Sequence, residues 1–408
     1  MIELTYVLPL RWDAEAEGDV EEMTGYLREL SRHVPVIVVD GSPGPIFADH
    51  AHRWGGMVRH VPPDPLPPVA NGKVTGVITG VRLAATERVV IADDDVRYGA
   101  GALAAMHDLL GQADVVRPQN YFDPLPWHAC WDTARSLLNR SLGADYPGTL
   151  GVRRSMFLRM GGYDGDTMFE NLELIRTVLA HGGRERRAGG LFVRRLPPST
   201  DRFWAQRVRQ AYDDLAQPAR LVFFLALLPA LAVTPSRHRL RAVAAGAGVA
   251  VVLAEVGRCR DGGGADFPRT ASLLAPVWVA ERAVCVWWAL ALRLLLGGIR
   301  YRGGVVPTAA HSMRVLSRRA ARGSPRFTSP APEPPEQRPE RAARSDAGAG
   351  SRDGAGTGPP AQPGGGSAPP GARKPATLCD PSQNGLVADR PHRHSATVAR
   401  PGSMREPS

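Results

Sequence analysis

Short apolar runs alternate with helical stretches along the first half of the chain. The runs that predict β-strands are Leu4–Leu10, Val34–Val39, Met57–Val61 and Val89–Ala92. Between them, Asp19–Ser31 and Lys73–Thr86 have the pattern of helices. Strands that alternate with helices predict an α/β fold, in which a largely parallel sheet is covered by helices on both faces.

The carboxyl ends of these strands are where we expect a ligand, as in other open α/β sheets. The run Val89–Ala92 is followed by three carboxylates, Asp93, Asp94 and Asp95. Side chains alternate along an extended chain, so Asp93 and Asp95 face one side. Two like unit charges about 4 Å apart repel by about 4 kcal/mol at an effective dielectric of about 20. A divalent cation between the carboxylates makes the net interaction attractive. We predict Mg²⁺ or Mn²⁺ at Asp93 and Asp95, with a solvated acidic turn as the alternative.

Two more segments bring polar side chains to the same edge of the sheet. The strand Val34–Val39 leads into Asp40, which is either part of a binding site or only a turn former or helix cap. Lys73 follows Asn71 and Gly72 at the start of a glycine-bearing helix, whose backbone N–H groups suit a phosphate. The spacing matches neither the Walker P-loop nor the dinucleotide-binding GxGxxG pattern.

Three apolar runs follow residue 218. They are Leu221–Val233, Ala242–Val256 and Ser272–Gly298. The first two are shorter than the ~20 residues of a spanning helix, and Glu281 and Arg282 interrupt the third. Core helices are one interpretation. Three such runs in succession, with tryptophans in the third, favour a membrane-associated helical region over residues 219–311.

The arginines of this region predict a topology. If Leu221–Val233 lies in the cytoplasmic interface, the cluster Arg237–Arg241 stays inside. Ala242–Val256 then crosses outward, Arg258–Arg269 forms a short external loop, and the third run returns. The sheet domain, residues 1–218, would lie on the cytosolic side of the cell membrane.

Residues 312–408 are dominated by Pro, Gly, Ala, Ser and Arg and have almost no aliphatic periodicity. Such a segment buries too little apolar surface to offset its ordering entropy, which predicts a disordered basic tail. The tail is either a solvated extension or a contact with anionic lipid head groups.

Charge and cysteine content restrict the partners and the compartment. The formal net charge is +10, but residues 1–218 are net acidic and the basic excess lies in the rest of the chain. This distribution argues against a nucleic-acid partner for the first domain. The 4 cysteines lie far apart without CxxC spacing, which predicts a reducing compartment and no zinc site. The first strand begins almost at Met1, which predicts no cleaved signal peptide.

Several segments, taken in order over roughly residues 3–215, resemble the successive signatures of family 2 glycosyltransferases of the membrane-associated bacterial type. They are Leu8–Leu10, Val39–Ser42, Asn71–Lys73, Asp93–Asp95 and Gly161–Asp164. The resemblance implies a GT-A-like, Rossmann-like sheet flanked by helices, followed here by the membrane-associated helices and the disordered tail. It also implies a metal-dependent, inverting sugar transfer of the hexosyltransferase type.

The resemblance implies roles for individual residues at the donor site. Asp40 matches the strand-end acid that contacts the nucleobase. Asp93 and Asp95 match the pair that binds the metal and the diphosphate of the nucleotide sugar, with Asp94 between them in the donor site. Lys73 is implied to lie near the nucleotide.

The general base departs from the family pattern. Leu150–Arg154 and Gly161–Asp164 resemble the segments that line the acceptor pocket, and a Glu-Asp pair usually follows them. Here Glu170 is followed by Asn171, whose amide accepts no proton at neutral pH. The base is then Glu170 or Glu173, which share a face if this stretch is helical, or the site has lost activity. A partly desolvated carboxylate has a raised pKa that suits this work. We favour Glu170, which has the first position of the pair, and Glu173 is otherwise an ordinary exposed helix acid.

Gln206 and Arg209 resemble the start of the family's Gln-x-x-Arg-Trp element, with Gln210 at the position of the Trp. Arg209 is suited to stabilise the leaving diphosphate through charge-assisted hydrogen bonds. The alternative is a cationic helix face against lipid head groups. The missing Trp leaves open whether transfer is processive.

These inferences predict a transferase that uses a UDP- or GDP-linked sugar and a lipid-linked, polysaccharide or small-molecule acceptor beside membrane lipids. A nucleotidyltransferase is one alternative, but it usually has a glycine-rich basic loop after its first strand, which Leu8–Asp13 lacks. A degenerate, non-catalytic membrane protein is the other, because Asn171 and Gln210 depart from the family pattern.

Overall fold

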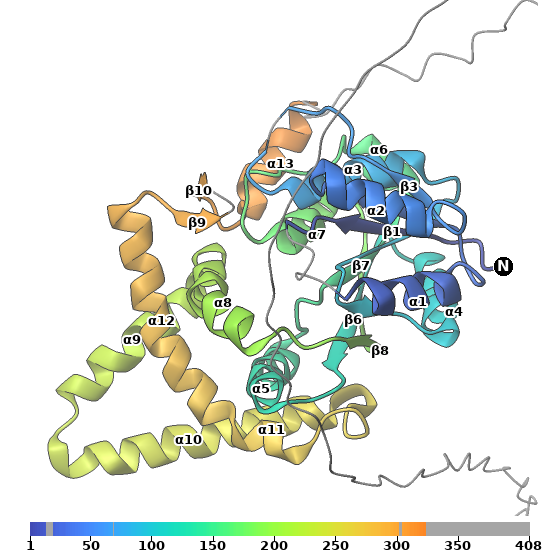
Figure 1. The fold of residues 1–408 in the computed structure, drawn as a ribbon. Coiled ribbons are helices and arrows are strands. Elements are labelled where there is room, and N and C mark those ends of the chain that lie inside the picture. The colour runs from blue at the N-terminus through green and yellow to red at the C-terminus, as the bar shows by residue number, and fades with distance from the viewer. Residues whose placement is uncertain (14–18, 68, 302–303, 324–408) are drawn as a thin grey trace, which may run out of the picture. The chain divides into compact units, whose positions relative to one another are not determined.

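A mixed eight-stranded sheet forms the centre of the N-terminal part of the chain (Figure 1). The computed structural model describes residues 1–13, 19–67, 69–301 and 304–323, so the predicted tail beyond 323 lies outside the described residues. The strands are β1 (Thr5–Leu10), β2 (Val36–Asp40), β3 (Arg59–Val61), β4 (Arg88–Ala92), β5 (Val96–Arg97), β6 (Val115–Phe122), β7 (Thr149–Arg153) and β8 (Glu185–Arg195).

The order of the strands is β3-β2-β1-β4-β7-β6-β8-β5. The pairs β3–β2, β2–β1 and β1–β4 are parallel, as predicted. Beyond them β7 runs antiparallel to both β4 and β6, β8 is parallel to β6, and β5 is antiparallel to β8. The carboxyl ends of β1, β2 and β4 therefore meet at one edge, where the sequence predicts the ligand.

Helices cover both faces of this sheet, which confirms the predicted α/β class. They are α1 (Val20–Leu30), α2 (Gly44–Trp54), α3 (Gly72–Leu83), α4 (Ala100–Leu110), α5 (Trp127–Leu142), α6 (Arg154–Arg159), α7 (Glu170–Ala180) and α8 (Thr200–Tyr212). One core joins α1, α2 and α4 to the sheet, and a second joins α3, α6 and α7 to it. We call the sheet and these helices the sheet domain.

Glycines let α3 approach β1 closely. A Cβ atom at Gly76 would lie 3.0 Å from Pro9 Cβ, and one at Gly80 would overlap Val7 Cγ1. The helix begins at Gly72 with Asn71 as its N-cap, so only its first turn reaches the edge of the sheet. Gly76 and Gly80 therefore serve the packing of the helix on the sheet rather than contact with a phosphate.

Three long helices follow residue 217, and we call them the helical frame. They are α9 (Pro218–Val233), α10 (Ser236–Cys259) and α12 (Ala275–Leu295), with the short α11 (Arg269–Leu273) between the last two. The three predicted apolar runs are thus confirmed as helical. Two helices, Ser236–Gly262 and Ala275–Leu295, are long and apolar enough to cross a membrane by length and composition.

The loop between α10 and α11 packs on the sheet domain. Arg140 of α5 donates from Nε to the carbonyl of Gly257 at 2.9 Å, and Arg260 Nη1 donates to the carbonyl of Arg140 at 2.9 Å. The rings of Phe192 in β8 and Phe267 lie 5.9 Å apart. The loop that the sequence predicts to be external therefore contacts the sheet domain directly.

Residues 304–323 return to the sheet domain. A hairpin of β9 (Ile299–Tyr301) and β10 (Gly304–Val306) follows α12, and Tyr212 donates its hydroxyl to the Pro307 carbonyl at 2.7 Å. Helix α13 (Met313–Ala321) packs on α7 and buries Leu316. The prediction of disorder from residue 312 is therefore wrong for Met313–Ala321, whose amphipathic face has a partner that local sequence does not reveal.

The packing of α3 gives a test of this fold. Gly80→Ala should lower the free energy of unfolding by about 1–3 kcal/mol, because the added methyl group overpacks the contact with Val7. The matched control is Gly25→Ala in α1, where nothing lies within 4 Å of the added Cβ. It should stabilise the helix by about 0.5–1 kcal/mol. Denaturant unfolding of both variants compares them, and equal effects would contradict the packing described.

Candidate active site

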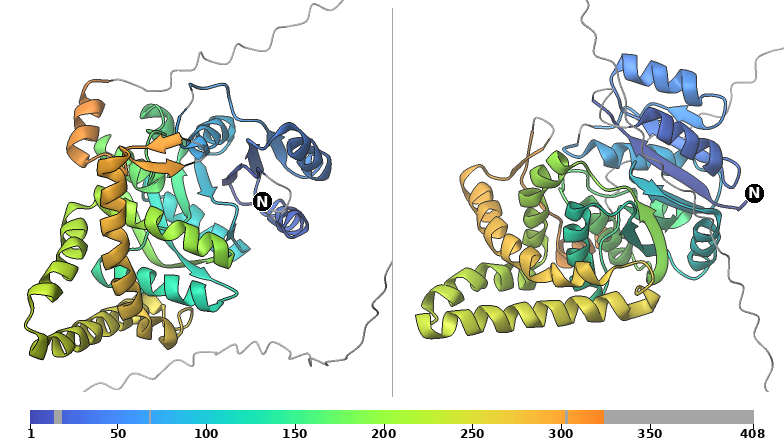
Figure 2. Two further views of the ribbon diagram at one scale, coloured as in Figure 1. Left: turned by 60° about the vertical axis from the view of Figure 1, so that its left-hand side comes forward. Right: turned by 60° about the horizontal axis from the view of Figure 1, so that its bottom comes forward.

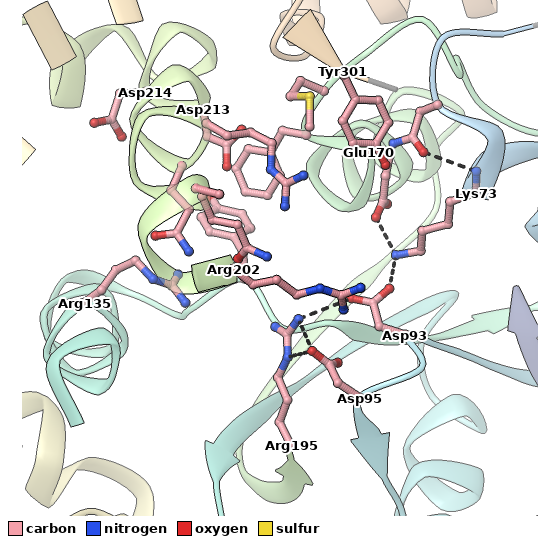
Figure 3. Close-up of a pocket in the computed structure, with 18 of the residues that line it drawn as sticks. Lys73, Asp93, Asp95, Arg135, Glu170, Arg195, Arg202, Asp213, Asp214 and Tyr301 are labelled. Carbon is pink, nitrogen blue, oxygen red and sulfur yellow. Dashed lines mark hydrogen bonds and ion pairs between the residues drawn. The ribbon is translucent and has the colours of Figure 1, made fainter. Parts of the chain in front are cut away.

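A cavity of about 710 Å³ opens at the carboxyl edge of the sheet (Figure 3). Side chains from α3, the end of β4, α7, α8 and the end of β8 line it. The structure brings into this cavity all but two of the residues that the sequence predicts for the site: Lys73, Asp93, Asp94, Asp95, Glu170, Gln206 and Arg209. Asp40 and Glu173 are the exceptions among the predicted residues.

Two of the three carboxylates after β4 are paired with cations from distant elements. Lys73 Nζ lies 2.5 Å from Asp93 Oδ1, and Arg195 Nη2 lies 2.9 Å from Asp95 Oδ2 and 3.6 Å from Asp93 Oδ2. Asp94 instead accepts a hydrogen bond from Trp12 Nε1 at 2.9 Å. Asp93 and Asp95 thus share the Arg195 guanidinium and Asp94 has another partner, but Asp94 and Asp95 lie in a turn rather than in the extended chain from which the sequence predicted this arrangement.

Asp95 has an oxygen that fits a divalent cation. Its Oδ1 atom is buried and has no hydrogen-bond partner among the described residues. Burial raises the pKa of Asp95 to about 6, against the opposing effect of Arg195 and with a further increase from Asp93 and Asp94. A donor set of carboxylate oxygens is the one that Mg²⁺ and Mn²⁺ prefer, so Asp93 and Asp95 fit the predicted metal.

Glu170 lies on the cavity wall as the first residue of α7. Its Oε1 lies 2.5 Å from Lys73 Nζ, and its Oε2 is buried without a hydrogen-bond partner among the described residues. Burial raises the pKa of Glu170, an effect that Lys73 opposes and Asp93 reinforces. Burial lowers the pKa of Lys73, but the charges of Asp93 and Glu170 outweigh it and hold that pKa above its ordinary value. A buried carboxylate with an unpaired oxygen is suited to accept a proton.

Helix α8 contributes the opposite wall. Gln206 and Arg209 both line the cavity, and the Arg209 guanidinium lies 5.7 Å from the centre of the Tyr301 ring. Arg209 forms no ion pair among the residues that the structure describes. Burial raises the pKa of Asp213, just after this helix, to about 7, while the charges of Arg282, Arg209 and Arg135 oppose the shift.

Several cavity residues were not predicted. Arg195 ends β8, a strand-end position of the kind that identified Asp93, so the pattern contained a usable signal. Arg135, Arg202 and Asp213 come from helical segments without such a signal. Arg282 and Tyr301 belong to the region interpreted as membrane-associated, and only the tertiary fold brings them to the cavity.

Asp40 lies beneath the site rather than in it. Its Oδ2 accepts hydrogen bonds from His50 Nδ1 at 2.7 Å and His60 Nε2 at 3.0 Å, and its Oδ1 accepts one from the Ser42 amide at 2.9 Å. Burial opposes ionisation, but these hydrogen bonds outweigh it and lower the pKa of Asp40 well below its ordinary value. The structure thus places Asp40 away from the cavity lining, with its carboxylate oxygens already hydrogen-bonded.

Glu173 is also hydrogen-bonded by protein groups outside the cavity lining. It is fully buried and accepts hydrogen bonds from the His311 amide at 2.7 Å and His311 Nδ1 at 2.9 Å. Nearby, Arg319 donates to Asp164 at 3.0 Å, so the cluster ties α13 to α7. The interpretation of Glu173 as an exposed acid is therefore wrong. Asn171 points away from the cavity lining and donates to the Pro147 carbonyl at 3.1 Å.

Among the described residues, two clusters of side chains away from Asp93 and Asp95 also have metal-ligand chemistry. They are Asp40 with His50 and His60, and Asp164 with Glu173 and His311. In the first the ligand atoms already hydrogen-bond one another, and in the second the Arg319 guanidinium lies beside the carboxylate. Protein groups therefore already satisfy the charges of both clusters.

Comparison with known proteins gives similarities to solved structures only. No family model matches the sequence, and no curated protein matches it. The mannosyltransferase PcManGT from Pyrobaculum calidifontis, solved with GDP-Man and Mn²⁺, is 15% identical with a TM-score of 0.40 over 70% of this chain and 87% of its own. Residues 1–349 of TarS from S. aureus are 11% identical with a TM-score of 0.38, over 74% and 95% of the two chains.

A third similar structure is the glucosyl-3-phosphoglycerate synthase from Mycobacterium tuberculosis in complex with Mn²⁺, UDP-glucose and phosphoglyceric acid. It is 17% identical with a TM-score of 0.36, over 52% of this chain and 78% of its own. At TM-scores this low, none of these similarities assigns a residue or a substrate to this chain.

The environment of Asp40 gives a stability test. Asp40→Asn should lower the free energy of unfolding by about 2 kcal/mol at neutral pH, because hydrogen bonds to a buried charge are lost. The folded pKa lies below the unfolded value of about 3.9, so this contribution is present above about pH 4 and is lost as the pH falls through the folded pKa. The difference in the free energy of unfolding between the variant and the wild type should therefore become smaller as the pH falls below about 4, as measured by unfolding curves at several pH values.

The matched control for Asp40 is Asp49→Asn on α2. Asp49 forms a solvent-exposed ion pair with Arg53 at 2.8 Å, and its loss should cost less than about 1 kcal/mol. Equal, small effects of both substitutions would show that the Asp40 cluster does not stabilise the edge of the sheet.

Proposed function

We propose that this protein is a metal-dependent, inverting glycosyltransferase that uses a UDP- or GDP-linked sugar. One observation supports this above all others. A single cavity holds acids suited to a divalent cation, a buried carboxylate and an arginine: Asp93 and Asp95, Glu170, and Arg209. Among the described residues, Glu170 Oε2 has no hydrogen-bond partner and Arg209 has no ion pair. Sugar transfer from a nucleoside diphosphate needs these three functions together.

The donor site follows from the charges around Asp93 and Asp95. These two residues would hold Mg²⁺ or Mn²⁺, which supplies charge neutralisation of the diphosphate when bound. Lys73 and Arg209 face the same cavity and would add cationic hydrogen-bond donors to the phosphate oxygens. Gln206, one turn before Arg209, and Asp94 complete the proposed donor contacts.

Asp40 has a positioning role in this proposal. Its carboxylate accepts from the Ser42 amide, and Ser42 Oγ in turn accepts from the Trp12 amide at 3.0 Å. Trp12 donates to Asp94, so the Asp40 cluster supports one wall of the donor site. The nucleobase contact that the family resemblance assigned to Asp40 then falls to residues of the cavity wall such as Trp12 and Asp13.

Glu170 is the proposed general base. Lys73 holds its Oε1 in place, which leaves Oε2 free for the acceptor hydroxyl. The hydroxyl oxygen attacks the anomeric carbon as its proton passes to Glu170, and the bond to the nucleoside diphosphate breaks on the opposite face. Attack and departure on opposite faces invert the anomeric centre, and no covalent intermediate forms on the enzyme.

The acceptor is proposed to be a hydroxyl on a lipid-linked, glycan or small-molecule substrate at the cytosolic face of the membrane. The helical frame supports this location, because its exposed surface is largely apolar and Arg282 from α12 lines the cavity. A lipid-linked acceptor in the adjacent leaflet would therefore have a short path to Glu170.

Donor binding tests the proposed metal site. A screen of UDP, GDP and their sugars by thermal shift should give one nucleotide that stabilises the purified protein in the presence of Mn²⁺. Asp95→Asn should weaken this binding at least about tenfold, since a ligand of the cation is lost. Equal binding in EDTA, or full binding by the variant, would remove the metal from the proposal.

Turnover tests the base. Glu170→Gln should lower sugar transfer or donor hydrolysis by about 100-fold or more, because the amide cannot take the proton. The contrasting variant is Glu173→Gln, which should lower the melting temperature but leave turnover per folded molecule within a few fold. The reverse result would exchange the roles of the two glutamates, and no activity with any nucleotide sugar would favour a non-catalytic protein.

A further inference from the structure

Helix α12 is bound to the sheet domain along its length. Arg282, in its middle, is 1% exposed and lies 3.3 Å from Asp214, while Glu281 lies 3.5 Å from Arg207 of α8. At its end the β9–β10 hairpin places Tyr301 on the cavity. A helix whose central charged residues and C-terminal hairpin contact the sheet domain does not leave that domain to cross a bilayer.

Helix α10 is anchored in the same way at one end. Its second half packs on α5, where Gly257 lies so close to Leu137 that a Cβ atom would overlap the Leu137 carbonyl oxygen. The loop that follows contacts Arg140, as described above. The first half of α10 has no such partner, and both views in Figure 2 show it projecting with α9 beyond the sheet domain.

The outer surface of the helical frame is apolar. In α12 the residues Val277, Val284, Trp288 and Leu295 are exposed and recur at intervals of seven, four and seven, so they form one stripe. Ala275, Trp278, Arg282 and Val286 form the buried stripe on the other side. The exposed apolar residues of α9 and α10 include Val222, Phe223, Leu228, Val233, Leu240, Val243, Val249 and Val252. Exposed apolar residues gathered on three helices that pack on one another indicate a membrane or a partner.

The charge of the frame favours an anionic membrane. Arg237, Arg239 and Arg241 lie at the corner where α9 meets α10, and none of them pairs with a carboxylate among the described residues. No Asp or Glu occurs between Asp214 and Glu255. Apolar side chains beside uncompensated arginines are typical of helices that lie in the interface of an anionic bilayer.

We infer that the helical frame lies in a single anionic leaflet and that none of its helices crosses the membrane. The apolar stripe of α12 and the exposed apolar residues of α9 and α10 enter the leaflet, and the corner arginines contact the lipid head groups. This inference rests on the membrane location in the proposed function but not on its chemistry. It replaces the predicted pair of crossings, which would separate the loop at Arg260 from Arg140.

Vesicle binding tests whether an anionic membrane covers the apolar surface of the helical frame. The purified full chain should bind vesicles of phosphatidylcholine with about 30% phosphatidylglycerol far more tightly than vesicles of phosphatidylcholine alone, and salt should weaken the binding. The triple variant Arg237→Gln, Arg239→Gln, Arg241→Gln should bind about 100-fold more weakly, since each arginine near an anionic surface contributes roughly fivefold.

The matched control removes the same charge from α13 and its C-cap with Arg314→Gln, Arg318→Gln and Arg322→Gln, which should change binding far less. Figure 1 and the left view of Figure 2 both place α13 away from the α9–α10 corner. Equal loss in both triple variants, or a soluble dimer that covers the frame and ignores vesicles, would overturn the inference. An inactive protein that still binds vesicles would overturn only the proposed reaction.

Labelling in cells tests the single leaflet. In a chain whose native cysteines are replaced by serine, Glu3→Cys reports the sheet domain and Ala265→Cys reports the loop between α10 and α11, and both positions are exposed. A membrane-impermeant maleimide should label both from the same side, when intact cells are compared with inverted vesicles. Labelling of the two positions from opposite sides would establish a crossing and overturn the inference.

Discussion

The arrangement of the site depends on the repulsion among three consecutive carboxylates at the end of β4. Such crowding is tolerated only where cations reach it, and the chain supplies them from α3 and from the end of β8. Lys73 and Arg195 are therefore fixed around Asp93 and Asp95, and Lys73 in turn holds Glu170. One electrostatic requirement thus brings the proposed donor site and the proposed base together in a single cavity.

Periodicity predicted the strand β4 and the helix α3, which bear part of this site, but it predicted neither β8 nor α8. The helix predicted over Asp19–Ser31 is Val20–Leu30 with Asp19 and Ser31 as its caps, because the capping side chain and the apolar spacing are both local signals. Strand-end acids were equally visible. Arg195 pairs with Asp95, which lies 100 residues earlier in the chain, and a local sequence pattern does not predict contacts over such a separation.

Burial explains where the structure departs from the arrangement that the sequence predicts. Asp40 and Glu173 are acids at plausible positions, but histidines from other elements enclose them, and only the tertiary fold reveals those partners. Hydropathy likewise counts the apolar residues of α12 without showing that Arg282 faces the sheet domain. The same helix that passes a test of length and composition for a membrane span is held along its length by a folded domain.

The most direct test of the account is an anomalous difference map from crystals grown with Mn²⁺ and the nucleotide that binds. We expect a manganese peak in contact with Asp95 and the diphosphate, with Arg209 turned towards the phosphates. A peak at Asp40 with His50 and His60, or nucleotide bound outside the cavity that Glu170 lines, would contradict it.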